Sequence, residues 1–438
     1  MKSKKGIELW KKAKKIIPGG NQLLSKRAEM FLPDQWPAYY SKAKGIEVWD
    51  LDGNKYLDFT NMAVGACILG YADPDVNKAV KKVVDGGSVS TLNPPEEVEL
   101  AEMLCRLHPW AEMARYARTG GEAMVVAVRI ARAASGKDKV AFCGYHGWHD
   151  WYLSANLAKD KNLDGHLLAG LEPRGVPRGL QGTALPFTYN HPEELEKIMS
   201  ENKDIGVIVL EPLRHQEPQN NFLQKVRKIA DQKKAVLVFD EISIGWRVNG
   251  RGVHMNYNVY PDIAVFGKTI SNGYPMAAII GRKKVMDAAQ QTFISSSYWT
   301  ERIGPVASLA TLKKIKEKKV PAHIKRIGKM IGDGWIKLAD KHNLRIKIDG
   351  PEALITFSFD YDAENQLLRT IFIQEMLKRG FLAGGSVYVS LAHTDSSVKK
   401  YLEAVDKVFA LLKKGLEENN LRKILKGPIA HSGFQRLT

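Results

Sequence analysis

Cysteine is scarce in this chain, with three among 438 residues. Cys67, Cys105 and Cys143 are an odd number, lie far apart and form no CxxC pair, so they fit neither a disulfide framework nor a zinc site. This usage is typical of a reducing compartment. We therefore expect no disulfide framework and no metal centre.

Long hydrophobic runs are also missing. No stretch approaches the roughly 20 apolar residues that a membrane-spanning helix needs. The first residues, MKSKKGIELWKKAKK, are charged where a secretory signal would be apolar. We therefore expect a cytoplasmic protein that does not span a membrane.

Acidic residues are in deficit, because 48 Asp and Glu face 65 Lys and Arg and give a formal net charge of +17. A basic protein can bind nucleic acid, anionic lipid or an acidic metabolite, or can simply carry a lysine-rich surface. In the basic run 313–319 (KKIKEKK) the lysines alternate with apolar residues, and aromatic residues suited to a nucleic-acid groove are missing. We expect neither a nucleic-acid nor a membrane partner.

Apolar residues are plentiful, at 44% of the chain, so a sizeable core can form. Short apolar runs that read as buried strands alternate with segments of helical period. These runs are 139–143, 205–210, 235–239, 263–266 and 276–281. Continuous apolar strands between helices are typical of a mainly parallel sheet that is covered on both faces. The predicted fold class is therefore α/β.

The two ends of the chain differ from this core. Residues 46–59 alternate apolar and polar side chains around Asp-Gly-Asn, which predicts a β-hairpin. Beyond about residue 310 the chain is lysine-rich and helical, returns to strand-like stretches, and ends in a predicted helix over 396–416. We divide the chain into an N-terminal segment 1–75, a large domain 76–310 and a C-terminal domain 311–438. The first and last of these would form a smaller α+β lobe.

A pair of glycines opens the segment 118–136 (RTGGEAMVVAVRIARAASG), which reads as a helix that is apolar on nearly all sides. Backbone N–H groups of Gly120, Gly121 and Glu122, together with the positive end of the helix dipole, could hold an anion such as phosphate. A Gly-Gly helix start is also common in ordinary loops, so this segment alone decides little.

Two predicted strand ends carry reactive side chains. Asp240 and Glu241 follow the strand 235–239, and in an open α/β sheet ligands bind beyond the carboxyl ends of the strands. Lys268 follows the strand 263–266, and a lysine in an apolar setting can act as a nucleophile that forms a Schiff base. Taken singly, the acids could cap a helix and the lysine could be one of many on the surface.

A helix start for phosphate, an acid at one strand end and a lysine at the next are the groups that pyridoxal 5′-phosphate needs. Together with the segments 144–149 (GYHGWH) and 300–307 (TERIGPVA), in this order and spacing, they make the sequence resemble the class III aminotransferases of fold type I. Within that family it resembles the glutamate-1-semialdehyde aminomutase subgroup. The resemblance covers nearly the whole chain, from Ile17 to Asp395.

The resemblance implies a role for each matching residue. Lys268 would form the Schiff base with pyridoxal phosphate and carry the 1,3-proton shift, and Asp240 would be the partner of the pyridine nitrogen. The other cofactor-binding residues would be Gly120 and Gly121 at the phosphate, Tyr145 and Ile242 on the two ring faces, Glu211 near the cofactor oxygen and Thr300 at the phosphate of a neighbouring subunit. This arrangement implies a homodimer with shared active sites. Relatives usually have a hydroxyl residue where Gly121 stands.

Each of these roles competes with a plainer one. Tyr145 and His146 could be packed core residues, Ile242 needs only a core, and Glu211 could cap a helix. Arginines that could clamp a donor carboxylate or pair on the surface are Arg214, Arg247 and Arg302. Aromatic residues that could stack on a sugar or fill a core or an interface are Trp148, His149, Trp151, Tyr298 and Trp299.

Some positions depart from the aminomutase pattern. Val64 stands where a tryptophan is expected, Gly385 falls near a glutamate of the subgroup, and Lys26 and Arg27 stand in a shifted setting for its arginine. The lost volume and charge would widen the pocket. A wider pocket favours a transaminase, which releases one product and admits a second substrate.

We therefore predict a transaminase that moves an amino group from an amino acid, with glutamate as the first choice, to a carbonyl acceptor such as a keto sugar. Intramolecular amino transfer of the glutamate-1-semialdehyde aminomutase type is the alternative within the family. A PLP-binding scaffold or regulator without catalytic activity is the alternative of another class.

Overall fold

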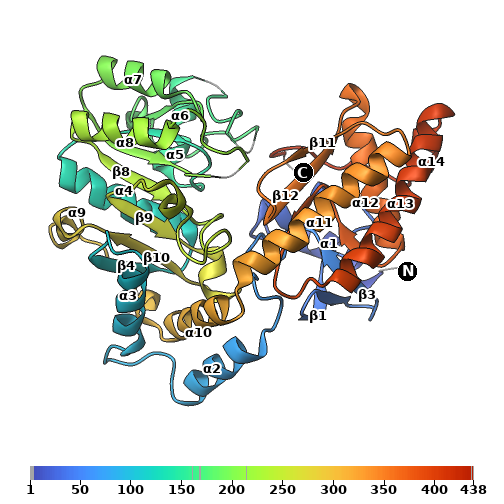
Figure 1. Cartoon of the computed structure of the whole chain (residues 1–438), viewed down its shortest axis with the longest axis horizontal. Coiled ribbons are helices and arrows are strands. Elements are labelled where there is room, and N and C mark those ends of the chain that lie inside the picture. Colours follow the sequence, from blue (N-terminus) through green and yellow to red (C-terminus); the bar gives the residue numbers. More distant parts are fainter. Residues whose placement is uncertain (1–3, 160, 167–168, 214, 436, 438) are drawn as a thin grey trace. The chain divides into compact units, whose positions relative to one another are not determined.

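The computed structural model describes residues 4–159, 161–166, 169–213, 215–435 and 437. The chain forms two compact units, and Figure 1 colours their elements along the sequence. Unit 1 combines Met1–Asp73 with Val320–Thr438, and unit 2 is the continuous stretch Pro74–Lys319. The N-terminal and C-terminal segments therefore belong to the same unit.

Unit 2 is built on a seven-stranded sheet with the strand order β4-β10-β9-β8-β7-β5-β6. Its strands are β4 (Met113–Ala117), β5 (Lys139–Cys143), β6 (Ala184–Pro186), β7 (Ile205–Leu210), β8 (Val236–Asp240), β9 (Ile263–Phe266) and β10 (Ala277–Gly281). Neighbouring strands are parallel except at β10, which runs antiparallel to both β4 and β9. The predicted α/β fold with a mainly parallel sheet is confirmed.

Strand β10 reverses direction because its connection to β9 is short. Only residues 267–276 join the two strands, and the 3-10 helix η5 (Lys268–Ser271) takes up part of them. A crossover to a parallel neighbour needs about a dozen residues or more. Since β4 is also antiparallel to β10, β4 runs in the same direction as β9. The carboxyl ends of β4, β8 and β9 therefore share one edge of the sheet.

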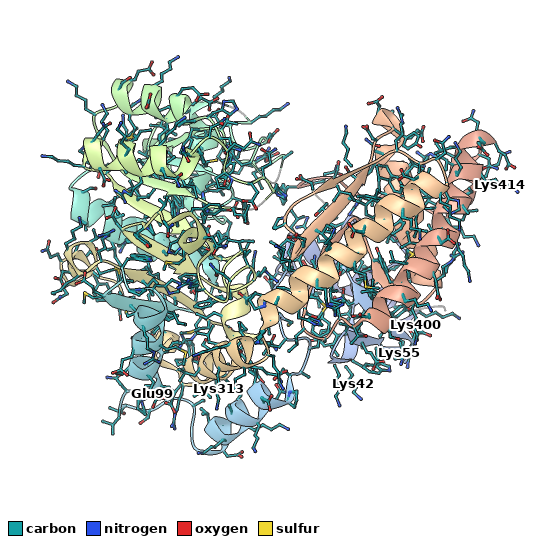
Figure 2. All side chains as sticks on the ribbon, viewed as in Figure 1. Lys42, Lys55, Glu99, Lys313, Lys400 and Lys414 are labelled. Carbon is teal, nitrogen blue, oxygen red and sulfur yellow. The ribbon has the colours of Figure 1, made fainter. Side chains whose placement is uncertain are left out.

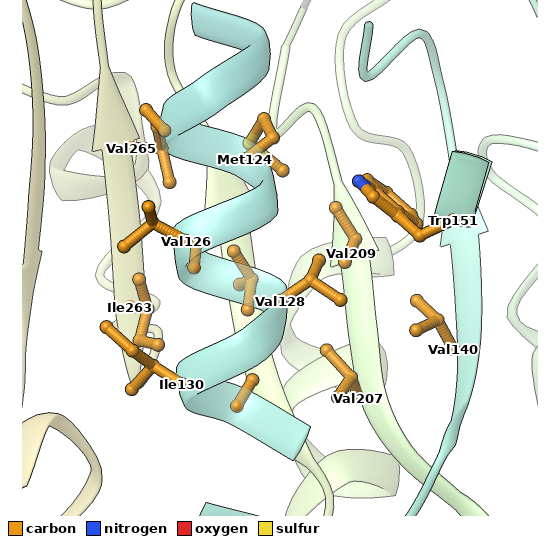
Figure 3. Close-up of a cluster of buried hydrophobic side chains, with 14 of the residues drawn as sticks. Met124, Val126, Val128, Ile130, Val140, Trp151, Val207, Val209, Ile263 and Val265 are labelled. Carbon is orange, nitrogen blue, oxygen red and sulfur yellow. The ribbon is translucent and has the colours of Figure 1, made fainter. Parts of the chain in front are cut away.

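Helices cover both faces of this sheet. The helices of unit 2 are α2 (Pro74–Asp85), α3 (Glu96–Leu107), α4 (Gly120–Ser135), α5 (Asp150–Leu153), α6 (Ala155–Ala158), α7 (Pro192–Glu201), α8 (Phe222–Lys233), α9 (Lys283–Met286) and α10 (Ile303–Glu317). On one face, Val128 of α4 packs in a cluster with Val209 and Val265 (Figure 3). On the other face, Leu223 of α8 packs in a cluster with Phe239. Burial on both faces explains why these strands read as unbroken apolar runs.

Unit 1 contains two smaller sheets. The first, with the order β1-β2-β3-β13, consists of β1 (Tyr40–Lys44), β2 (Glu47–Asp50), β3 (Lys55–Phe59) and β13 (Phe381–Ala383). The second is antiparallel and consists of β11 (Ile346–Asp349), β12 (Leu354–Phe359) and β14 (Ser386–Tyr388). The helices of unit 1 are α1 (Lys5–Ile16), α11 (Val320–Lys341), α12 (Asn365–Lys378), α13 (Asp395–Glu417) and α14 (Leu421–Ile424). Strands β2 and β3 form the hairpin predicted over 46–59.

Exposed lysines lie on the surface of both units. Lys42, Lys55 and Lys400 in unit 1 and Lys313 in unit 2 are exposed and project from the ribbon in Figure 2. Among the helices of the described residues, none combines the length and the hydrophobicity needed to cross a membrane. The three cysteines are free thiols.

Candidate active site

Helix α4 begins at the carboxyl end of β4 with two glycines and a capping box. Thr119 Oγ1 accepts a hydrogen bond from the backbone N–H of Glu122 (3.3 Å), and Glu122 Oε2 accepts one from the backbone N–H of Thr119 (2.9 Å). This reciprocal pair fixes the first turn, which contains Gly120 and Gly121. A Cβ on Gly120 would lie 3.0 Å from Ile242 Cδ1. The glycine therefore keeps clear a space at a helix N-terminus, where the backbone N–H groups and the helix dipole favour an anion.

Asp240 ends β8 with a carboxyl group that is 4% exposed. Its Oδ2 lies 2.8 Å from His146 Nδ1, and its Oδ1 accepts a hydrogen bond from the backbone N–H of Ile242 (3.0 Å). His146 Nε2 lies 3.1 Å from the carbonyl oxygen of Cys143, which can only accept, so Nε2 carries a proton. The Nδ1···Oδ2 contact then needs a proton as well, which resides either on the imidazole or on the carboxyl group. The pair therefore holds one shared, buried proton at the end of β8.

Lys268 directly follows Gly267 at the end of β9. Its backbone φ is 44°, in the left-handed region that residues other than glycine rarely adopt. Such backbone conformations concentrate at functional sites, where the surrounding structure holds them. Lys268 Nζ donates a hydrogen bond to Ser243 Oγ (2.7 Å), three residues beyond Asp240. This contact links the ends of the two strands that were predicted to carry the acid and the lysine.

Ile242 lies between the start of α4 and the residue before Lys268. A Cβ on Gly267 would lie 3.3 Å from Ile242 Cγ2, and the same side chain faces the missing Cβ of Gly120. The isoleucine is half-buried and packs against the core cluster on the α4 face of the sheet. Its side chain therefore forms an apolar surface between the anion-binding turn and the lysine.

The loop after β5 brings Tyr145 to the same edge of the sheet. The backbone N–H of Tyr145 donates to Glu211 Oε2 (3.3 Å), and Glu211 is 5% exposed at the end of β7. Gly144 has a φ of 113°, and a Cβ there would lie 2.8 Å from Glu211 Oε2, so this position requires glycine. A Cβ on Gly121 would lie 3.0 Å from His149 Nε2, which brings this loop against the start of α4.

Most of the predicted site residues therefore converge. Those at the carboxyl edge of the unit 2 sheet are Gly120, Gly121, Tyr145, Glu211, Asp240, Ile242 and Lys268. Thr300 is exposed at the end of the 3-10 helix η7 (Ser297–Thr300), and its Oγ1 donates to the carbonyl oxygen of Ser297 (3.1 Å).

The arginines considered for a carboxylate clamp have other surroundings. Arg302 donates to both carboxylate oxygens of Glu96, each at 2.8 Å, which is the pairing that competes with a clamp. Arg247 is 1% exposed, and its Nε donates to the carbonyl oxygen of Ser243 (2.8 Å). Arg214 lies outside the described residues.

The aromatic residues considered for sugar stacking divide into two groups. Trp151 is buried in the core cluster of the α4 face, and Trp299 packs partly against that cluster. Trp148 and Tyr298 are exposed, and the ring of Trp148 stacks on His149 with centroids 4.2 Å apart. Trp148 and Tyr298 therefore have exposed ring surface, Trp299 is partly buried and Trp151 is buried.

Two residues of the site carried little signal in the sequence. Ser243 was missed, although its position in the loop that follows the strand end of Asp240 could have marked it. For His146 a core role was left open beside a functional one, and the sequence does not show its contact with Asp240, which is 94 residues away. Its burial among aromatic rings agrees with a packed residue, and its ring nitrogens give it a second role.

A cavity of ≈ 450 Å³ opens beside Glu211 at the carboxyl ends of β5, β6 and β7. Burial lowers the pKa of His166 to about 4, so its ring is neutral near pH 7. His166 Nδ1 accepts the backbone N–H of Gly144 (3.2 Å), which leaves Nε2–H as a donor. Further polar residues of the lining are Asn162, Thr188, Glu194, His215 and Gln216. The cavity therefore offers both donors and acceptors next to the convergent residues.

Comparison with known proteins identifies the family. The model of the family described as aminotransferase class-III matches residues 32–409. The chain is 30% identical to a 3-aminobutyryl-CoA aminotransferase of Cloacimonas acidaminovorans, over 95% of this chain and 99% of that protein. It is also 30% identical to a glutamate-1-semialdehyde 2,1-aminomutase of Methanocaldococcus jannaschii, over 93% of this chain and 99% of that protein. A 2′-deamino-2′-hydroxyneamine transaminase of Streptomyces kanamyceticus is 28% identical, over 85% of this chain and 91% of that protein.

Solved structures agree with the fold and with the cofactor. The FumI protein of Sphingopyxis sp. MTA144, solved in its PLP internal aldimine form, superposes with a TM-score of 0.85 and 25% identity, over 96% of this chain and 99% of that protein. The match covers both units. From the family match, these relatives and the fold, this chain belongs to the class III aminotransferases and is a pyridoxal-phosphate-dependent transaminase of fold type I.

Proposed function

We propose that this transaminase takes an amino group from an amino acid donor, glutamate, and passes it to the carbonyl group of a polar acceptor such as a keto sugar. The main support for a polar acceptor is the polar cavity beside Glu211. Its lining combines neutral His166 with amide and carboxylate side chains, and these groups can form hydrogen bonds with the hydroxyl groups of a ligand. The relative named for 2′-deamino-2′-hydroxyneamine supports an acceptor of this kind.

The residues at the sheet edge fit pyridoxal phosphate. The space that a Cβ on Gly120 would fill lies at a helix N-terminus and suits the phosphate group. Backbone N–H groups of Gly120 and Gly121 would hold that group, although Gly121 lacks the hydroxyl common in relatives. Tyr145 and Ile242 would flank the ring, and Glu211 would lie near its oxygen.

The Asp240 pair and the lysine would supply the proton chemistry of the site. Bound pyridoxal phosphate contributes an electron-accepting ring and a carbon that carries the amino group between the two substrates. The Asp240 carboxyl group, oriented by its contact with His146, would accept a hydrogen bond from the protonated ring nitrogen and so keep the ring electron-poor. Lys268 Nζ would bind the cofactor in the resting enzyme and then move a proton at the substrate α-carbon. Ser243 Oγ, which accepts from Nζ at 2.7 Å, would hold the amine in position between these steps.

Intramolecular amino transfer is the second candidate, because the chain is 30% identical to a glutamate-1-semialdehyde 2,1-aminomutase. The two reactions differ in what leaves the site. A transaminase releases an oxo acid from the donor before the acceptor binds, whereas an aminomutase must retain its diamine intermediate. Gly385 and Val64, which replace larger residues of the aminomutase pattern, favour release.

The half-reaction with the donor tests the proposal. We expect the purified holoenzyme, mixed with L-glutamate alone, to release one 2-oxoglutarate per active site, and then to convert keto sugars until the stored amino group is used up. Lys268→Ala should release none, while Lys284→Ala, which changes an exposed lysine of α9, should behave as the parent enzyme. Rearrangement of a single amino aldehyde, without release of any oxo acid from amino donors, would move the assignment to the aminomutase.

We also propose that the chain works as a homodimer in which Thr300 reaches the cofactor phosphate of the partner subunit. Large apolar side chains on the surface of unit 2 support an interface there. Phe293 is 85% exposed, Tyr298 74% and Trp148 69%. Tyr298 lies in the same short helix as Thr300, and Trp148 lies in the loop that contacts the start of α4. Burial of such a group against a second copy would bring Thr300 to an interface.

A further inference from the structure

Unit 1 contains a cavity of its own, with a volume of ≈ 500 Å³. It is bordered by strands β12 and β14, helix α12 and the N-terminal segment around Met30. Its lining includes the glycine pair Gly384 and Gly385, where the sequence lacks the glutamate of the aminomutase pattern. All lining residues belong to unit 1, so the cavity is defined without reference to unit 2.

Arg369 of α12 faces this cavity with a positive charge that the chain does not balance. Its Nη2 donates to the backbone carbonyl oxygen of Met30 (2.9 Å). Among the described residues, no carboxylate lies within ion-pair distance of its guanidinium group. Burial alone lowers the pKa of Arg369, with no acidic neighbour to oppose the effect. A partly desolvated guanidinium without a counter-ion is costly, and a bound anion would remove that cost.

Two other cations of unit 1 show the pairing that Arg369 lacks among the described residues. Arg326 donates to both carboxylate oxygens of Asp395 (2.7 and 2.9 Å). Lys347, at the cavity wall, donates to Asp360 Oδ1 (2.8 Å), and this pairing lowers the pKa of Asp360. The carboxylate that lines the cavity is thus already neutralised by Lys347. The cavity is therefore left with the charge of Arg369.

The rest of the wall can complete an oxyanion site. Hydroxyl groups line it at Ser25, Thr356, Ser358 and Ser386, and a hydroxyl group can donate to an anionic oxygen. The planar guanidinium fork matches the two oxygens of a carboxylate or of a phosphate. Phe31, Phe359 and Phe372 supply apolar walls for the remainder of a small ligand.

We propose that the unit 1 cavity binds the oxyanion group of a small ligand, a carboxylate or a phosphate, with Arg369 as its counter-ion. Its volume falls within the range of pockets for small organic molecules, about 300–1,000 Å³. The site stands on contacts within unit 1 and does not depend on the proposed donor or acceptor. Arg369 would let this cavity recognise a negatively charged group. The cavity has room for such a ligand because glycines stand where the aminomutase pattern has a glutamate.

Calorimetric titration of the PLP-loaded full chain tests the site, with glutarate, inorganic phosphate and uncharged glutaramide as the probes. We expect one of the two anions to bind and glutaramide not to bind. Arg369→Gln should weaken anion binding by about thirty-fold or more, because it removes one partner of a buried charge pair. Arg326→Gln, at a paired arginine of the same unit, should leave anion binding unchanged. Preference for glutarate identifies a carboxylate ligand, and preference for phosphate identifies a phosphate-bearing one.

A second pair of variants keeps the test decisive if Arg369→Gln folds poorly. A Cβ on Gly384 would meet no atom within 4 Å, so a longer side chain can be accommodated there. Gly384→Glu would supply an internal carboxylate and should abolish anion binding, while the isosteric Gly384→Gln should retain it. The proposal is overturned if neither anion binds the parent protein, or if Gly384→Glu binds it as well as Gly384→Gln does. These readouts measure binding alone, so they are independent of whether glutamate is the amino donor.

Discussion

At the scale of single residues, His146 shows how one side chain can satisfy two interpretations. Its ring is buried among Phe142, Trp151 and Tyr152, as a core histidine would be. The same ring lies between two acceptor oxygens, one on Asp240 and one on a backbone carbonyl. Packing therefore fixes the ring, and the fixed ring fixes the proton that Asp240 shares. A core role and a catalytic-site role do not exclude each other here.

A second buried histidine, His393 in unit 1, makes the stability of that unit depend on pH. Its Nδ1 accepts hydrogen bonds from Ser390 N–H and Oγ–H (3.1 and 2.9 Å), and its Nε2–H donates to the carbonyl oxygen of Asp58 (3.0 Å). These contacts suit the neutral ring. Burial lowers its pKa from 6.5 to about 4, and the neighbouring His323 contributes in the same direction.

We predict that unit 1 loses stability as the pH falls from 6.5 towards 4. In this range the unfolded chain takes up a proton on His393 and the folded chain does not, so the stabilising contribution is complete above pH 6.5 and fades below it. At pH 5 the loss should be about 2 kcal/mol. Urea unfolding at pH 7.5 and pH 5 measures it.

Substitution of the same histidine provides the control. His393→Gln should lower the free energy of unfolding at pH 7.5, because the three buried hydrogen bonds of the ring are disrupted. It should also flatten the difference between the two pH values by roughly 2 kcal/mol. His191→Gln, at an exposed histidine of unit 2, should leave that difference unchanged. An unaltered pH dependence in His393→Gln would assign the effect to other groups.

At the scale of elements, helix α4 uses glycine differently at its two ends. At the N-terminus, a Cβ on Gly120 would lie 3.0 Å from Ile242 Cδ1, in the space proposed for the phosphate. At the C-terminus, Gly136 caps the helix with a φ of 65°, and a Cβ there would meet no atom within 4 Å. The first glycine is needed for space and the second for its backbone conformation.

We therefore predict that alanine at the two ends has separable effects. Gly136→Ala should cost roughly 1–2 kcal/mol of stability, because a Cβ disfavours the left-handed conformation. It should leave the affinity for pyridoxal phosphate unchanged. Gly120→Ala should weaken that affinity about ten-fold or more, which corresponds to loss of about one charge-assisted hydrogen bond. Fluorescence titration of the apoenzyme measures the affinity for pyridoxal phosphate, and urea unfolding measures the stability. Equal losses of affinity in both variants would mean that the helix start acts only through stability.

Elements with two buried faces were predictable from the sequence. The runs 139–143, 205–210 and 263–266 match β5, β7 and β9 to the residue, because burial on both faces leaves no polar interruption. Strand β4 was missed because Arg115 and Tyr116 break its apolar pattern. The direction of β10 could not be read from its residues, since strand direction depends on the length of the connection before it.

The convergence of the candidate site residues at one sheet edge was predictable, and their contacts were not. Asp240 and Lys268 stand at strand ends, which the apolar runs reveal, and the resemblance to a family supplied their roles. The hydrogen bond of Lys268 to Ser243 and that of Asp240 to His146 arise only when separate loops meet at one sheet edge. Thr300 has no local pattern that would indicate a role, because its proposed contact belongs to another copy of the chain.

At the scale of the whole molecule, the proposed homodimer with shared active sites predicts complementation between two defective chains. Lys268→Ala removes the reactive amine of its own site, and Thr300→Asp would repel the phosphate in the partner's site. In a mixed dimer both defects fall in one site and the other site is intact. Refolding a 1:1 mixture should therefore restore about a quarter of the parent number of active sites, since half of the dimers are mixed.

Light scattering checks the dimer, and turnover of each variant alone gives the baseline. A mixture that is no more active than the sum of its components would place Thr300 outside the partner's site. Thr300→Ser, which keeps the hydroxyl group, should retain activity without mixing. Loss of activity in this conservative variant would point to a structural role for the threonine.

The parallel direction of β5 and β7 also bears on how this protein can be modified. Because their carboxyl ends lie at the cofactor side, the connections 136–138 before β5 and 202–204 before β7 lie at the opposite edge of the sheet. These lie a strand length, about 16 Å, from the cofactor side. Lengthening a surface loop costs only about 0.6 kcal/mol per doubling of its length. A reporter peptide or a pair of new chain ends can therefore be introduced at that edge. The enzyme can then be attached to a surface through this edge while its cofactor side stays accessible.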